Sequence, residues 1–118
     1  MSRTAQGLRG WLLQRFTAIY LALYVLAVPV AAALGGPFDY ATWRTWLGAP
    51  WIGIATALCA VAVLVHAWIG VREVLIDYVH TLWLRLLLMA ASALVLLGSA
   101  LWVLRALVLA ATGSGAQP

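Results

Sequence analysis

The sequence has few charged residues and almost no acidic ones. Of its 118 residues, 8% are charged and 66% are apolar, whereas about a quarter of the residues in an ordinary soluble domain are charged. Three residues are acidic, and the seven basic residues are all arginines scattered along the chain, so the net charge is +4 without a basic patch. This composition cannot cover a water-exposed surface, which excludes a soluble enzyme domain, a disordered tail and a nucleic-acid-binding domain. The composition predicts an integral membrane protein.

Cysteine and catalytic motifs are scarce as well. The single cysteine, Cys59, lies inside an apolar run, so neither an internal disulfide nor a zinc-type cysteine cluster can form. We interpret Cys59 as a small hydrophobic residue within a helix. The sequence contains no glycine-rich phosphate loop and no Ser–His–Asp set. We therefore expect no catalytic residue in this chain.

Long stretches without charge are what the sequence does contain. Three of them occur, with 23 residues at 16–38, 27 residues at 45–71 and 19 residues at 86–104. About 20 helical residues cross a hydrocarbon core of about 30 Å, and backbone amides in lipid must be satisfied within the helix. The sequence thus predicts an all-α membrane protein with three transmembrane helices in a single domain, 1–118. Their expected bounds are Trp11 to Leu34, Trp51 to Tyr78, and Trp83 to Ala111.

Proline and glycine mark the ends of these predicted helices. Gly35, Gly36 and Pro37 are expected to end the first helix, because a flexible pair is followed by a residue that cannot continue it. Pro50 is expected at the start of the second helix, where its missing N–H group costs little. The polar tail from Thr112 to Pro118 is expected to be frayed.

Arginines predict the orientation of the three spans. Five lie at the N-terminus and around the second connector, and two lie at the opposite ends of the spans; they are Arg3, Arg9, Arg15, Arg72 and Arg85 against Arg44 and Arg105. Because arginine is retained on the cytoplasmic side, the N-terminus is predicted to be cytoplasmic and the C-terminus periplasmic.

His66 is the most informative polar residue, because it lies within the second predicted span. Two interpretations are open. The imidazole is either hydrogen-bonded to a neighbouring helix or an axial ligand of a haem iron. The only other histidine, His80, falls near the cytoplasmic surface. A six-coordinate haem would therefore take its second ligand from another chain.

Asp77 and Tyr78 follow His66 at the predicted cytoplasmic edge. If the helix continues that far, eleven residues return His66 and Asp77 to within about 20° of each other, about 16 Å apart along the axis. They are either the solvated end of a helix or an acid and a phenol below the candidate ligand. Arg15, on the same side, is predicted either to reach lipid phosphate or to pair with a haem propionate.

The stretch from His66 to Val79 (HAWIGVREVLIDYV) closely resembles the second-helix motif of the succinate dehydrogenase membrane anchors of bacteria. The segments Arg15 to Tyr20 (RFTAIY) and Leu84 to Leu86 (LRL) resemble the first and third helices of that family. The resemblance extends from about Leu12 to Leu88, and the spacing from the histidine to the Asp-Tyr pair is its specific part.

The resemblance implies a four-subunit complex in the bacterial inner membrane. In it, a flavoprotein and an iron–sulfur protein oxidise succinate. This chain and a second membrane anchor hold a b-type haem and the site that reduces quinone, expected to be ubiquinone. By the matching motif, His66 would be an axial ligand of the haem iron, and Tyr78, with Asp77 beside it, would bind the quinone. Arg15 would lie near the haem propionates. His80 departs from the basic residue expected after Tyr78 and Val79, and no role is assigned to it.

Two other functions remain open at this point. A haem-free anchor of a fumarate reductase would share the quinone site and leave His66 structural. A small homo-oligomeric transporter would use His66, Glu73 and Asp77 to bind a proton or cation. The position of the two acids at the membrane edge disfavours the transporter, because transporter sites lie near the midplane.

Overall fold

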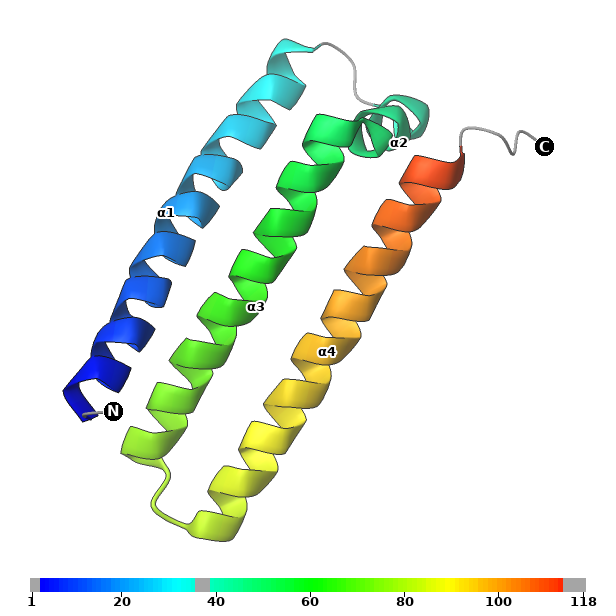
Figure 1. Cartoon of the computed structure of the whole chain (residues 1–118). Helices are drawn as coiled ribbons and strands as arrows, with labels where there is room; N and C mark the ends of the chain where they lie inside the picture. The colour runs from blue at the N-terminus through cyan, green and yellow to red at the C-terminus, as the bar shows by residue number, and fades with distance from the viewer. Residues whose placement is uncertain (1–2, 36–38, 114–118) are drawn as a thin grey trace.

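A computed structural model of the chain describes residues 3–35 and 39–113, and this part contains no β-strand. It consists of α1 (Arg3–Leu34), α2 (Tyr40–Gly48), α3 (Pro50–Tyr78) and α4 (Leu82–Thr112) (Figure 1). The all-α prediction is therefore confirmed. The expected role of Gly36 and Pro37 in ending α1, and the tail after Gly113, lie outside the described residues.

Three of the helices are long and apolar enough to cross a membrane. The spans are Ala5–Leu34, Pro50–Tyr78 and Leu82–Thr112, which confirms the three transmembrane helices expected from the gaps between charges. α1 begins eight residues before the expected start at Trp11. The expected start marked only where the apolar run begins, whereas the backbone hydrogen bonds of the helix extend further toward the N-terminus.

α2 is a short helix in the first connector that the sequence analysis did not predict. Asp39 precedes it, and its carboxylate accepts a hydrogen bond from the Thr42 backbone N–H at 2.7 Å. This bond stabilises the charged form of the carboxylate and lowers the pKa of Asp39. α2 ends at Gly48, and Pro50 begins α3 at its first helical position, as expected.

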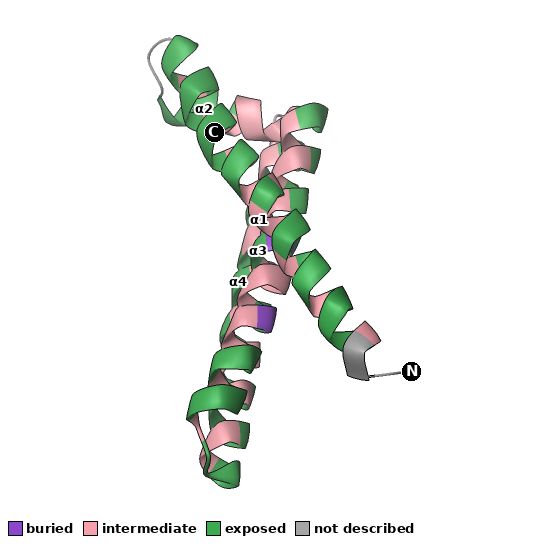
Figure 2. Ribbon diagram, turned by 90° about the vertical axis from the view of Figure 1, so that its left-hand side faces the viewer, coloured by how far each residue is buried: buried purple, intermediate pink, exposed green. Residues whose placement is uncertain are grey.

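α3 is the central helix of the bundle. It packs against α1 on one side and α4 on the other, while α2 packs against the ends of α3 and α4 (Figure 1). Viewed from the side, α1 crosses the other two long helices, and its N-terminal turns lean away from them (Figure 2). The three long helices therefore form an open layer with α3 in the middle.

This layer buries very little of its own surface. Among the described residues only Ala62 and Ile69, both on α3, are buried, with 8% and 7% of their surface exposed (Figure 2). The large apolar side chains of α1 and α4 are mostly exposed. Apolar surface of this extent requires hydrocarbon or other protein chains around it.

Candidate functional site

The contact between α1 and α3 contains three polar side-chain interactions. The Thr17 hydroxyl lies 3.1 Å from Nδ1 of His66. One turn further, the Tyr20 hydroxyl donates to the Ala55 carbonyl oxygen at 2.6 Å. Tyr24 and Thr56 share a hydrogen bond of 2.7 Å between their hydroxyls. Polar contacts of this kind hold transmembrane helices in a defined register.

His66 is half-buried on α3, with its ring toward α1. Its Nδ1 is the atom that meets Thr17, and within the described part of the chain its Nε2 makes no hydrogen bond. One nitrogen of the ring is thus held by the fold, while the other is available. Metal-bound histidines have this arrangement, in which the nitrogen that does not bind the metal is fixed by a hydrogen bond.

Thr17 is not among the site residues predicted from the sequence. A signal for it was nevertheless present, because Thr17, Tyr20 and Tyr24 follow one another at spacings of three and four residues in an otherwise apolar run. These spacings place the three hydroxyls on one face of α1. The hydroxyl face of α1 is the face that contacts α3.

Arg15 is not brought to His66. It is exposed, and its guanidinium carbon lies 5.4 Å from the centre of the Trp11 ring. Two residues along a helix correspond to a rotation of about 200°, so Arg15 lies nearly opposite Thr17 on α1. Its expected place beside a haem propionate stays a prediction.

Asp77 and Tyr78 lie at the end of α3, and both are exposed. α3 is continuous from Pro50 to Tyr78, so the condition for placing His66 and Asp77 on one face of a single helix is met. Tyr78 exposes 79% of its surface. A binding site around this phenol therefore requires surfaces from outside the described residues. His80 follows in the short connector to α4 and is exposed too.

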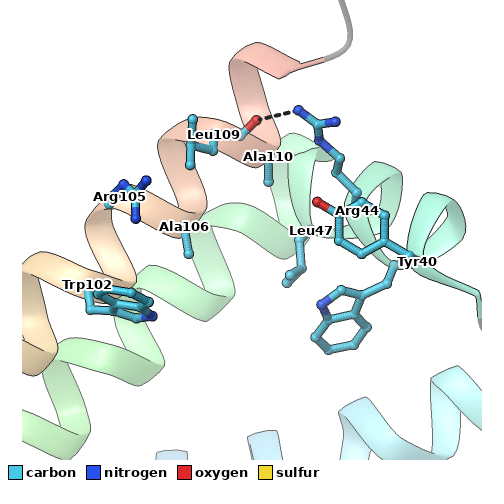
Figure 3. Close-up of a pocket in the computed structure, with 9 residues that line it drawn as sticks. Tyr40, Arg44, Leu47, Trp102, Arg105, Ala106, Leu109 and Ala110 are labelled. Carbon is cyan, nitrogen blue, oxygen red and sulfur yellow. Dashed lines mark hydrogen bonds between the residues drawn. The ribbon is translucent and has the colours of Figure 1, made fainter. Parts of the chain in front are cut away.

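A cavity of about 510 Å³ lies at the opposite end of the molecule, between α2 and α4 (Figure 3). There the Arg44 guanidinium donates a long hydrogen bond of 3.5 Å to the Leu109 carbonyl oxygen, and Arg105 lies over the Trp102 ring. None of the candidate site residues lines this cavity. The candidate site and this cavity belong to different ends of the bundle.

No group of three or more His, Cys, Asp or Glu side chains that could hold a metal ion occurs in the described residues. An iron held by a porphyrin does not need such a group, because the macrocycle supplies four ligands and the protein supplies only the axial ones. The half-buried imidazole with one available nitrogen fits that requirement.

Comparison with known proteins settles the family. The family described as succinate dehydrogenase/fumarate reductase transmembrane subunits matches residues 1–100. The chain belongs to this family. It is also 32% identical over 111 residues to the succinate dehydrogenase hydrophobic membrane anchor subunit of Coxiella burnetii (strain RSA 493 / Nine Mile phase I), covering 93% of this chain and 96% of that protein.

Membership of the family defines what this chain is in general terms. It is a multi-pass membrane anchor subunit of the succinate dehydrogenase/fumarate reductase family, and it acts as a non-catalytic part of an enzyme complex with partner subunits. This assignment favours an anchor over the homo-oligomeric transporter considered from the sequence.

Proposed function

We propose that this anchor supplies His66 as one axial ligand of a b-type haem, shared with a second membrane anchor. The observation that carries the proposal is the half-buried imidazole whose Nδ1 is bonded to Thr17 and whose Nε2 is available. When bound, the haem supplies a one-electron redox centre within the membrane. His66 would hold and orient that group, and Arg15, whose guanidinium now lies over the Trp11 ring, would turn toward its propionates.

We further propose that Tyr78 and Asp77 form this chain's part of the quinone-reduction site. Reduction of a quinone consumes two protons, so the site must lie where protons arrive from water. Both side chains are exposed at the end of α3. The Tyr78 hydroxyl donates a hydrogen bond to a quinone carbonyl oxygen, and the Asp77 carboxyl holds or transfers a proton. We take ubiquinone as the quinone.

The complex that we propose has four subunits in the bacterial inner membrane. A flavoprotein and an iron–sulfur protein oxidise succinate and deliver electrons to the anchor pair. The second anchor supplies the other axial ligand and further walls of the quinone site. The low burial of this chain on its own is consistent with such a neighbour.

The experiment is a reduced-minus-oxidised absorption spectrum of membranes in which this chain is co-expressed with its three partner subunits. We expect a b-type band that disappears in His66→Ala. The matched control is His80→Ala, which removes the only other histidine, exposed in the connector, and should leave the band unchanged.

Two results would contradict the haem proposal. A band that persists in His66→Ala would mean that the iron has other ligands. Absence of a band in the wild type, with quinone reduction intact, would identify a haem-free anchor of the fumarate reductase kind, with His66 in a structural role.

A further inference from the structure

The Thr17 hydroxyl has a single proton, and a carbonyl group on its own helix accepts it. Thr17 Oγ1 lies 2.7 Å from the Leu13 carbonyl oxygen, four residues earlier, and 3.2 Å from that of Gln14. A threonine hydroxyl has one O–H donor and two acceptor lone pairs. Once the proton points to Leu13, the hydroxyl presents only a lone pair to any third group.

The third group is Nδ1 of His66, at 3.1 Å from the same oxygen. Since the hydroxyl can only accept here, the imidazole nitrogen must be the donor and must carry a proton. A neutral imidazole protonated at Nδ1 has its lone pair at Nε2. The hydrogen-bond chain from His66 through Thr17 to Leu13 therefore selects the tautomer that can bind a metal through Nε2.

We propose that Thr17 is a positioning residue for the axial ligand. Its hydroxyl accepts the Nδ1–H of His66, fixes the tautomer, sets the rotation of the ring about its bond to the chain, and makes Nε2 a stronger electron donor. This inference rests on the proposed role of His66 as a haem ligand and adds a residue from a different helix to that site.

A hydrogen bond of this kind has a definite effect on the bound group. A hydrogen-bond acceptor at the ring nitrogen that does not bind the metal raises the basicity of the nitrogen that does. The more basic ligand favours the ferric over the ferrous state of the iron. Removal of such a partner typically lowers metal affinity or activity about 10- to 100-fold. Because Thr17 and His66 are both half-buried between helices, water is not there to replace the lost acceptor as freely as at a surface.

The test compares three variants in the assembled four-subunit complex. Thr17→Val keeps the shape and removes the hydroxyl, and Thr17→Ser restores a hydroxyl. Thr56→Val is the matched control, because it also removes a hydroxyl that bonds across the α1–α3 contact, with Tyr24 instead of His66. The readouts are haem content, the haem midpoint potential and the electron paramagnetic resonance signal of the ferric haem.

In Thr17→Val we expect a higher midpoint potential, an altered ferric signal and about 10-fold or greater weakening of haem retention. If the haem is lost altogether, recovery of haem and potential in Thr17→Ser supports the same conclusion. Thr56→Val should match the wild type in potential and signal.

The inference is overturned if Thr17→Val keeps the wild-type potential and signal, if Thr17→Ser fails to restore them, or if Thr56→Val changes them equally. These failures are distinct from failure of the proposed function. A b-type band that persists in His66→Ala removes the ligand assignment itself, whatever the Thr17 variants do.

Discussion

Tyr78 has no part in holding the described fold together. It exposes 79% of its surface at the last turn of α3, and its hydroxyl makes no hydrogen bond within the described residues. Tyr20 and Tyr24, by contrast, use their hydroxyls to join α1 to α3. A free phenol at the end of a transmembrane helix is therefore available for a ligand, and its removal should leave the helices unchanged.

We predict that Tyr78→Phe lowers quinone reduction roughly 10-fold, the equivalent of one lost hydrogen bond of about 1.4 kcal/mol. Succinate oxidation with an artificial soluble acceptor should remain close to wild type, because that route does not use the quinone site. Steady-state assays of both activities on the same membranes make the comparison.

The matched control is Tyr40→Phe, which removes another exposed phenol, 77% exposed, at the opposite end of the molecule. It should affect neither activity. Equal loss of both activities in Tyr78→Phe would show that Tyr78 acts through assembly of the complex.

At this scale the sequence predicted the ligand candidate but not its partner. His66 could be identified because an imidazole in an apolar run needs a compensating interaction. Thr17 could not be paired with it, because the pairing depends on the crossing angle and register of α1 against α3. A hydropathy pattern contains neither quantity, and the register emerges only when the two helices are packed.

At the scale of elements, α2 and α4 come unusually close at Gly48. A Cβ atom added to Gly48 would lie 2.6 Å from the carbonyl oxygen of Ala110, which is backbone and cannot rotate away. Only glycine permits this approach of the two helices. The approach, at the last residue of α2, holds this helix against the ends of α3 and α4.

We predict that Gly48→Ala destabilises the packing of α2 on α4 by about 1–3 kcal/mol, as overpacking of a tight contact typically does. The measurement is thermal unfolding of the purified complex, read as a lower melting temperature. The control is Gly98→Ala on α4, where an added Cβ meets nothing within 4 Å. That variant should be neutral or slightly stabilising, since alanine favours a helix. Equal melting temperatures in the two variants would contradict the predicted clash.

The three long helices could be predicted from the sequence, whereas α2 could not. The three spans follow from the length of the uncharged runs, which is a property of each helix alone. α2 has only nine residues, with Arg44 among tryptophans and threonines, so neither its length nor its hydropathy distinguishes it from a loop. Its helical form depends on the cap at Asp39 and on docking against α3 and α4, and docking is a tertiary property.

At the scale of the whole molecule, the two ends of the bundle differ in charge. One end gathers the start of α1, the end of α3 and the start of α4 (Figure 1). Five of the seven arginines lie in those segments, and the other two, Arg44 and Arg105, lie toward the end that carries α2. Asp77 and Tyr78 share the arginine-rich end, where the proposed quinone site would exchange protons with water.

The asymmetry predicts a cytoplasmic arginine-rich end and a periplasmic α2, and impermeant labelling can test this. In a Cys59→Ser background, which removes the only cysteine, Tyr40→Cys and His80→Cys each place one exposed thiol at an opposite end of the bundle. In intact spheroplasts a membrane-impermeant maleimide should label Tyr40→Cys and not His80→Cys, and permeabilisation should expose His80→Cys. Labelling of His80→Cys alone in intact spheroplasts would show that the chain has the opposite orientation in the membrane. It would place Asp77 and Tyr78 on the side away from the succinate-oxidising subunits, and the proposed quinone site would then have to be abandoned.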